Sequence, residues 1–353
     1  MVGVRRRIEE IVRTKEMERV HILVLAAAVW AFPAIAQMPA MAPQRVHALV
    51  GDPRKVTFIP HWYPQAQFAG YYVAVDAGIY RKYGLDVVIL PGGPDNPSIK
   101  LLADRKADFA TIWLTSAVQS RDDGIKLVNI AQIIQKSALM FVAKKSSGIR
   151  TPQDMNGKKI GVWGGDFTLQ PLAFITKYRL DVKLVNQPYS VNLFLRDGVA
   201  VTSAMWYNEY HVIIDSGYNP DELVTFFFSD HDLNFPEDGI YCLDETYARD
   251  PELCMNFTAA SLEGWRYAFD HPDEALEIIM KYVGQRHLRT NRAHQKWMLD
   301  RMKDIILLET PGAGKLNRDE YVKVCGELRR RGFIHEVPEY EGFYKDCVVH
   351  VPR

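Results

Sequence analysis

Short apolar runs alternate with amphipathic stretches along this sequence from residue 55 onward. The runs are about as long as buried strands, and the stretches between them carry apolar residues at helical spacing. The first block predicts strands at 55–59, 85–90 and 109–113, and helices at 65–81 and 98–105. Strands that alternate with helices are typical of a mainly parallel sheet covered by helices.

The same rhythm starts again further along the chain. Here the pattern predicts strands at 158–163, 182–185 and 199–206, and helices at 168–178 and 191–197. The sequence therefore predicts two α/β units of similar layout.

Two further apolar runs, at 138–143 and 240–243, are predicted to carry the chain from the first unit to the second and back. After residue 245 the pattern becomes helical, and these helices are expected to pack on the first unit; they are predicted at 251–269, 272–283, 290–308 and 317–332. The expected lobes are residues 55–140 with 241–353, and residues 141–240.

The first 36 residues follow a different pattern. Residues 22–32 form an unbroken apolar run that is too short to span a bilayer, and six basic residues precede it. Ala34-Ile35-Ala36 follows as a small-x-small cleavage signature. We interpret residues 1–36 as a signal peptide cleaved near Ala36, although a buried hydrophobic helix has the same composition, and translation could start at Met1 or Met17.

Export without an anchor predicts a periplasmic location. Residues 37–54 contain three prolines and little periodicity, and are expected to form a flexible leader. The 353 residues include 43 basic and 43 acidic side chains, and 48% are hydrophobic. Balanced charge argues against a nucleic-acid partner, and a monomer that binds a small molecule is expected.

The four cysteines lie at positions 242, 254, 325 and 347, with no C-x-x-C pair and no spacing typical of a metal site. An oxidising compartment would permit a disulfide between Cys325 and Cys347. Free buried thiols are the other interpretation, and the spacing does not decide between them.

Aromatic residues gather where the predicted strands end. Trp62 and Tyr63 follow the first strand, and Trp113, Trp163 and Trp206 end three others. Ligands of open α/β sheets bind at the carboxyl ends of the strands, and tryptophan faces suit a flat ligand. Each tryptophan taken alone could be a core residue, but four at equivalent positions favour a binding site.

Polar groups accompany these rings. Asn208 offers a donor and an acceptor, and Glu209 offers two acceptors, so together they could bind the edge of an aminopyrimidine; a helix start capped by Asn208 is the alternative. Gly164 and Gly165 could offer backbone N–H groups to a ligand. The predicted binding residues are Trp62, Tyr63, Gln67, Trp113, Ser116, Trp163, Gly164, Gly165, Tyr189, Trp206, Tyr207, Asn208 and Glu209.

Signatures of catalysis are missing from the sequence. It contains no G-x-S-x-G, no H-E-x-x-H and no P-loop. We therefore predict no catalytic residue, no metal ligand and no cofactor.

Several motifs in order resemble the NMT1/THI5-like group of periplasmic solute-binding proteins, most closely its thiamine-precursor (formylaminopyrimidine) binders. They are Trp62 with QFAGYYVA at 67–74, PGGP at 91–94, LADRKAD at 102–108, DMNGKKIGV at 154–162 and YNEY at 207–210. The resemblance implies a two-lobed Venus-flytrap fold, the type 2 periplasmic-binding-protein fold, with the ligand in the cleft. It also implies the permease subunits of an ABC transporter as partners, and ring contacts from Trp62, Tyr207 and Glu209.

The same superfamily includes pyrimidine synthases. They use a lysine that holds pyridoxal phosphate, a histidine and a cysteine-rich run, which align here with Ile112, Ser116 and residues 239–242. These departures argue against an enzyme. Riboflavin, a sulfonate or a nitrate-like anion remain alternative ligands.

Overall fold

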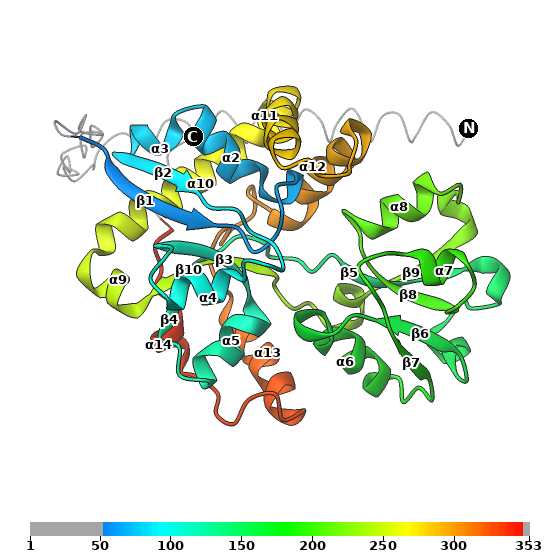
Figure 1. The fold of residues 1–353 in the computed structure, drawn as a ribbon. Coiled ribbons are helices and arrows are strands. Elements are labelled where there is room, and N and C mark those ends of the chain that lie inside the picture. The colour runs from blue at the N-terminus through cyan, green and yellow to red at the C-terminus, as the bar shows by residue number, and fades with distance from the viewer. Residues whose placement is uncertain (1–51, 349–353) are drawn as a thin grey trace, which may run out of the picture. The chain divides into compact units, whose positions relative to one another are not determined.

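The computed structural model describes residues 52–348. The chain divides into two units, residues 1–48 and 49–353, and every described residue lies in the second. The predicted signal peptide at 1–36 and nearly all of the leader at 37–54 lie outside the described residues. Within the second unit, the described strands form two five-stranded sheets, each flanked by helices (Figure 1).

The first sheet has the strand order β2-β1-β3-β10-β4. Its strands are β1 (Arg54–Ile59), β2 (Leu85–Ile89), β3 (Phe109–Trp113), β4 (Leu127–Gln132) and β10 (Asp238–Leu243). β1 pairs in parallel with β2 and β3, whereas β10 runs antiparallel to both of its neighbours. We call this sheet and its helices the first lobe.

The second sheet repeats this arrangement with the order β7-β6-β8-β5-β9. Its strands are β5 (Leu139–Lys144), β6 (Lys159–Val162), β7 (Lys183–Asn186), β8 (Val201–Met205) and β9 (Leu223–Phe227). Again one strand, β5, is antiparallel to its neighbours. This sheet and its helices are the second lobe. The predicted fold of two mainly parallel, helix-flanked sheets is confirmed.

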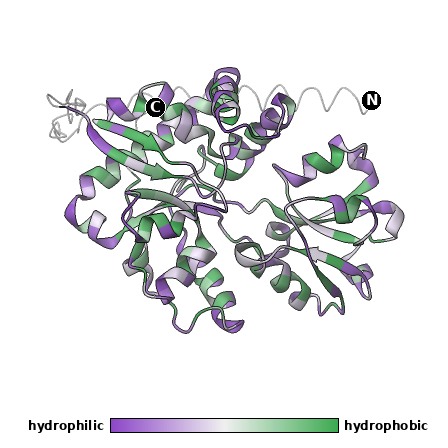
Figure 2. Cartoon of the chain, in the orientation of Figure 1, coloured by the Kyte–Doolittle hydropathy of each residue, from purple (hydrophilic) through white to green (hydrophobic). Residues whose placement is uncertain are grey.

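The chain enters the second sheet from the first at β5, and it returns to the first sheet at β10. Every residue of both is buried, which explains their near-continuous apolar sequences. Figure 2 shows the same distribution, with green hydrophobic strands inside and purple polar faces on the surrounding helices.

The connections between the lobes are hydrogen-bonded to one another. Glu237 Oε1 accepts from the backbone N–H of Ala138 at 2.6 Å and from the Ser137 hydroxyl at 3.1 Å. Asn234 accepts from the backbone N–H of Ser137 at 2.9 Å and donates to the carbonyl of Gln135 at 3.1 Å. These bonds tie the outgoing segment to the returning one, and we call residues 133–138 with 228–237 the hinge.

The predicted helix at 65–81 is wrong as a single element. The structure has a 3₁₀ helix η1 (Ala66–Phe68), then α2 (Ala69–Asp76) and α3 (Ile79–Lys82). The break falls at Gly78, whose φ of 70° is a left-handed conformation that ends one helix and redirects the chain. The predictions also omitted β4, β9 and α5 (Leu114–Asp122).

Of the six described helices after residue 243, the second to the fifth begin and end close to their predicted positions, and the first and the last were not predicted. They are α9 (Asp244–Arg249), α10 (Pro251–Asp270), α11 (Pro272–Gln285), α12 (Arg292–Ile306), α13 (Arg318–Arg330) and α14 (Tyr340–Phe343). α10 and α11 pack on α2, and α13 packs on α5, as expected for the first lobe. α12 packs on α11 and η1, but it also contacts α8 (Glu209–Asp215) of the second lobe.

The shorter helices are α4 (Ser98–Ala103), α6 (Leu169–Lys177) and α7 (Asn192–Leu195). All four cysteines are buried free thiols, so the pairing of Cys325 with Cys347 is not present. The sulfur atoms of Cys242, on β10, and Cys254, on α10, lie 3.9 Å apart. Among the described helices, none is both long and apolar enough to cross a membrane.

Candidate functional site

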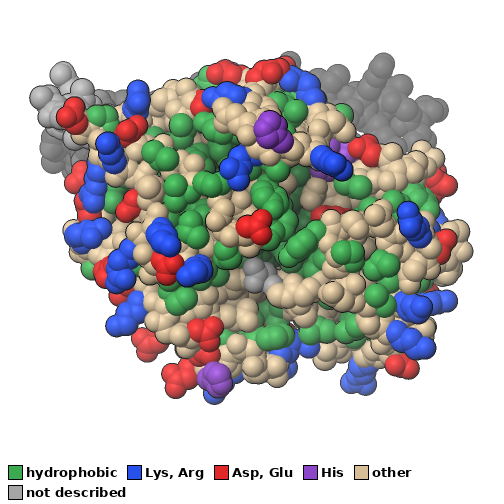
Figure 3. All heavy atoms as spheres, viewed as in Figure 1, with side chains coloured by type: hydrophobic (Ala, Val, Ile, Leu, Met, Phe, Trp, Pro, Cys, Tyr) green, Lys and Arg blue, Asp and Glu red, His purple; other side chains and the backbone are tan. Residues whose placement is uncertain are grey.

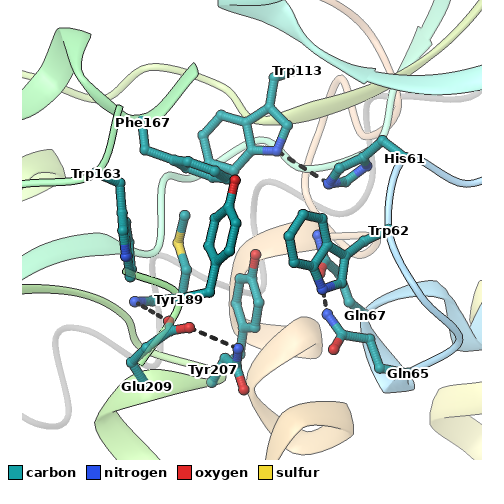
Figure 4. Close-up of a pocket in the computed structure, with 12 residues that line it drawn as sticks. His61, Trp62, Gln65, Gln67, Trp113, Trp163, Phe167, Tyr189, Tyr207 and Glu209 are labelled. Carbon is teal, nitrogen blue, oxygen red and sulfur yellow. Dashed lines mark hydrogen bonds between the residues drawn. The ribbon is translucent and has the colours of Figure 1, made fainter. Parts of the chain in front are cut away.

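A cavity of about 150 Å³ lies between the two lobes, where several strands end (Figure 4). Residues of both lobes line it: His61, Trp62, Gln65, Gln67, Trp113, Trp163, Phe167, Tyr189, Met205, Tyr207, Asn208 and Glu209. Six of the twelve are tryptophan, tyrosine or phenylalanine. The walls therefore suit a flat, apolar ring.

The wall from the first lobe is built on His61, Trp62 and Trp113. The indole Nε1–H of Trp113 donates to His61 Nε2 at 3.3 Å, so the hydrogen of the His61 ring lies on Nδ1. Nδ1 faces the Thr111 hydroxyl at 3.1 Å and Asp238 Oδ1 at 3.5 Å. Burial lowers the pKa of His61 to about 3, so the ring is neutral and its contact with Asp238 is not an ion pair.

The PGGP turn at 91–94 fixes the backbone that carries Trp62. A Cβ atom on Gly92 would lie 1.9 Å from the carbonyl oxygen of Pro60 and 2.6 Å from that of Trp62. Only glycine allows the two segments to approach this closely. The turn therefore acts on the cavity indirectly, by holding the Trp62 loop in place.

The wall from the second lobe contains Trp163, Phe167 and Tyr189. The indole N–H of Trp163 donates to the carbonyl of Pro188 at 3.2 Å, which positions the loop that carries Tyr189. Tyr189 is 67% exposed, so its position depends on ring contacts rather than on core packing. The Tyr189 and Trp62 ring centroids are 5.2 Å apart, and those of Phe167 and Trp113 are 4.9 Å apart, both edge-on across the cleft.

The polar group of the second lobe is Glu209, the first residue of α8. Its carboxylate turns back and accepts from the Met205 backbone N–H at 3.0 Å and from the Asn208 side-chain amide at 2.9 Å (Figure 4). Burial raises the pKa of Glu209 to about 7, and these hydrogen bonds oppose the shift. Each oxygen keeps a lone pair for a ligand.

The first lobe contributes two amides that face this carboxylate across the cavity. Gln67 donates to Asp238 Oδ2 at 3.0 Å and accepts from Gln65 at 2.6 Å. These bonds fix which atoms of Gln67 are donor and acceptor, because its oxygen must point toward Gln65.

The cavity lining contains no lysine or arginine. His61 and Glu209 are the residues of this lining whose side chains ordinarily titrate near or below pH 7. The lining also offers no amine that could hold pyridoxal phosphate. On the face seen in Figure 3, charged side chains lie mostly around the edge and hydrophobic ones gather toward the middle. An anionic ligand would therefore find no cationic partner in this lining.

The structure brings most of the predicted binding residues together. Those that line the cavity are Trp62, Gln67, Trp113, Trp163, Tyr189, Tyr207, Asn208 and Glu209. Tyr63 instead lines a neighbouring cavity of about 480 Å³.

Ser116, Gly164, Gly165 and Trp206 do not line the 150 Å³ cavity. Ser116 is buried in α5, and the two glycines are exposed. The carbonyl of Trp206 accepts from Trp297 Nε1 at 3.0 Å, so this residue joins the lobes outside the cavity.

The sequence reasoning missed His61, Gln65, Phe167 and Met205 as lining residues. His61 and Gln65 flank the Trp62–Tyr63 pair after β1, and their polarity in an otherwise apolar stretch was an available signal. Phe167 and Met205 are apolar, and no pattern distinguishes such residues from core positions.

Comparison with known proteins gives a family match over most of the described chain. The family model described as NMT1/THI5 like matches residues 65–275. Three of the curated relatives that match over at least two thirds of their own length illustrate the range of the family. The riboflavin-binding protein RibY of Chloroflexus aurantiacus is 26% identical over 71% of this chain and 73% of its own. The formylaminopyrimidine-binding protein of Halalkalibacterium halodurans is 25% identical over 62% of this chain and 68% of its own length.

The third relative is an enzyme by name. The 4-amino-5-hydroxymethyl-2-methylpyrimidine phosphate synthase of Legionella pneumophila is 25% identical over 67% of this chain and 75% of its own. Among solved structures, the periplasmic aliphatic sulphonate binding protein SsuA of Escherichia coli superposes with a TM-score of 0.66. That match covers 85% of this chain and 95% of SsuA at 12% identity, which shows the shared fold.

Proposed function

This chain belongs to the NMT1/THI5-like family, and we propose that it is the solute-binding component of an ABC importer. Its ligand is a small aromatic heterocycle held between the lobes, and a pyrimidine thiamine precursor fits best. The observation that carries the proposal is a cavity walled by six aromatic rings, with one carboxylate and no cationic side chain in its lining.

The size of the cavity favours a single ring. Its volume of about 150 Å³ equals that of an engineered cavity that binds benzene, so one pyrimidine ring fills it. A three-ring flavin would have to push the lobes further apart and separate Trp62 from Tyr189. Riboflavin is the second candidate because one relative carries that name.

The charge of the lining favours a neutral or protonated nitrogen heterocycle. Glu209 and Asn208 present acceptors and a donor at one edge of the cavity, which complements the amine and ring nitrogen of an aminopyrimidine. Sulfonate or nitrate would place its charge near the Glu209 carboxylate without a cation to offset it. These anions are therefore disfavoured as ligands.

A binding role, rather than pyrimidine synthesis, agrees with the residues at the aligned synthase positions. Ile112 has no amine for a Schiff base with pyridoxal phosphate, and Ser116 cannot replace a histidine as a proton carrier. Both side chains are buried, and neither lines the cavity.

Transport also requires export and lobe movement. The apolar run at 22–32, followed by Ala34-Ile35-Ala36, supports cleavage near Ala36 and delivery to the periplasm. We infer that the lobes, residues 55–140 with 241–353 and residues 141–240, rotate about the hinge when ligand enters. Closure would create the surface that permease subunits recognise in a monomeric binding protein.

The first test is native mass spectrometry of the protein from its host, followed by calorimetry with the released molecule. Formylaminopyrimidine and 4-amino-5-hydroxymethyl-2-methylpyrimidine are expected to bind, with riboflavin and an alkanesulfonate as comparison ligands. Tight riboflavin binding without pyrimidine binding would transfer the proposal to the second candidate. A bound pyridoxal absorbance with pyrimidine formation would refute the binding-protein assignment.

A further inference from the structure

A cluster of three side chains, two histidines and an aspartate, joins the lobes outside the 150 Å³ cavity. His211 and Asp215 lie one turn apart on α8 of the second lobe, and His294 lies on α12, which packs on the first lobe. Nδ1 of His211 is 2.9 Å from Nδ1 of His294 and 3.4 Å from Oδ2 of Asp215.

These separations fit a shared metal ion. Two ligand atoms at about 2.1 Å from one ion, at angles between tetrahedral and octahedral, lie about 3.0–3.4 Å apart. Both measured separations are within about 0.1 Å of that interval. The ligand atoms of the third pair, His294 and Asp215, lie within 4.8 Å of each other, so side-chain adjustment can bring this pair into the same interval.

The hydrogen bonding of His294 presents the correct nitrogen to the cluster. Its Nε2 lies 2.8 Å from Oδ1 of Asn208, and a carbonyl oxygen only accepts, so Nε2 carries the hydrogen. Nδ1 of His294 therefore has a free lone pair that points toward His211. A ligand histidine whose second nitrogen donates to a carbonyl oxygen is the usual arrangement at metal sites.

His211 is oriented by its surroundings as well. Its ring stacks on Trp297 of α12 at 4.9 Å between centroids, with 27° between the planes. In the metal-free cluster, the His211 Nδ1–H donates to His294 Nδ1. A metal ion would take the place of that hydrogen, and the ring hydrogen would then lie on Nε2, so that His211 binds as a neutral imidazole through Nδ1.

Solvent reaches the cluster through the neighbouring cavity of about 480 Å³, whose lining includes Asp215 and His294. Three protein ligands leave at least one coordination position, which water from this cavity would fill.

We propose that His211, Asp215 and His294 bind a divalent transition-metal ion that joins the two lobes. Two imidazole nitrogens and one carboxylate select zinc, nickel or cobalt over magnesium and calcium, which prefer all-oxygen sites. Asn208 contacts both His294 and Glu209, so this one side chain links the proposed metal site to the solute cavity. The site itself does not depend on which solute the cavity holds.

The test is calorimetric titration of Zn²⁺ into the chelator-treated full chain, with Co²⁺ absorption as a report of coordination. The protein should bind one Zn²⁺ that is lost in His211→Ala and His294→Ala, and Asp215→Asn should weaken binding by about tenfold or more. His271→Ala, which removes an exposed histidine outside the cluster, should bind as the unchanged protein does.

Asp215 is half exposed, so the Asp215→Asn variant should fold normally. This variant therefore decides the test even if a histidine variant is unstable. Equal Zn²⁺ affinity in the unchanged protein and all three cluster variants, or no Zn²⁺ binding by the unchanged protein, would overturn the site. Pyrimidine binding is measured separately in chelator, so its failure cannot be mistaken for failure of the metal site.

Discussion

Replacing Glu209 with glutamine tests the polar recognition in the cavity most directly. Both carboxylate oxygens accept from the protein, Oε2 from the Met205 backbone N–H and Oε1 from the Asn208 amide. Glutamine has one acceptor and one NH₂ group, so in either orientation a donor meets a donor. Asn208 cannot turn over to compensate, because its oxygen is engaged by His294.

The magnitude follows from the bonds that change. A hydrogen bond to a charged group contributes about 1.5–3 kcal/mol, and an unpaired buried donor costs about 1–3 kcal/mol. Ligand-free Glu209→Gln should therefore unfold at a lower temperature. Losing one charged contact to a pyrimidine should also weaken binding by about 1–3 kcal/mol, or about 5- to 150-fold in Kd.

The assay is calorimetry with formylaminopyrimidine, well below the melting temperature of the variant. Glu245→Gln is the matched control, since Glu245 is an exposed carboxylate paired with Arg105 outside the cavity lining. Unchanged affinity in Glu209→Gln would refute the assigned role of this carboxylate. An equal loss in Glu245→Gln would attribute the effect to net charge instead.

Three further predictions concern the cavity wall, its support and the hinge. Trp62→Ala should weaken pyrimidine binding by about 1–3 kcal/mol, the usual contribution of stacking on one ring, while Trp62→Phe should recover part of it in the same titration. Gly92→Ala should also weaken binding, although Gly92 is absent from the cavity lining, because the added Cβ displaces the Trp62 loop; affinity equal to that of the unchanged protein would contradict this. Burial raises the pKa of Glu237 from 4.5 to about 7, so the folded protein holds a proton that the unfolded chain releases between these values. The stability that this bound proton contributes is therefore lost as pH rises from about 4.5 to 7, by about 3 kcal/mol at most. Glutamine does not titrate, so melting curves should show Glu237→Gln gaining stability relative to the unchanged protein as pH rises over that range.

Most of the fold could be predicted, because the length of the apolar runs and the spacing of apolar residues distinguish the strands from the helices of an α/β fold. The crossing strand at 138–143 was predicted because all of β5 is buried, and burial on both faces produces a continuous apolar run. β4 is equally buried but reads LVNIAQ; its two polar residues use their side-chain amides inside the fold, where Asn129 donates to Gln132 and Gln132 donates to the carbonyl of Glu237. A pattern of apolar residues cannot detect a strand whose buried polar groups are paired through tertiary contacts.

The candidate site was only partly predictable, for a related reason. Trp113 ends β3 as predicted, and Trp163 directly follows β6, which ends one residue earlier than predicted; both side chains line the cavity at the carboxyl ends of these strands. Trp206 directly follows β8, yet its ring lies 4.9 Å from the Arg301 guanidinium and outside the cavity. The side on which the Trp206 ring lies depends on its contact with α12, nearly a hundred residues later in the sequence. The local pattern of residues holds no information about that contact.

Closure of the cleft therefore depends on two kinds of contact, and they respond differently to a ligand. The ring pairs Trp62–Tyr189 and Trp113–Phe167 border the cavity, so a ligand larger than one ring would separate them. The contacts of α12 with the second lobe, Trp297 to Trp206 and His294 to His211, lie away from the cavity lining and can persist. A ligand shifts the equilibrium between open and closed lobes only by the difference between its affinities for the two states. Stronger contacts of α12 make the closed state more populated before the solute binds. The apparent solute affinity then rises, although α12 does not touch the solute. Selection on α12 can thus adjust release to the transporter while the aromatic walls continue to determine which solute enters.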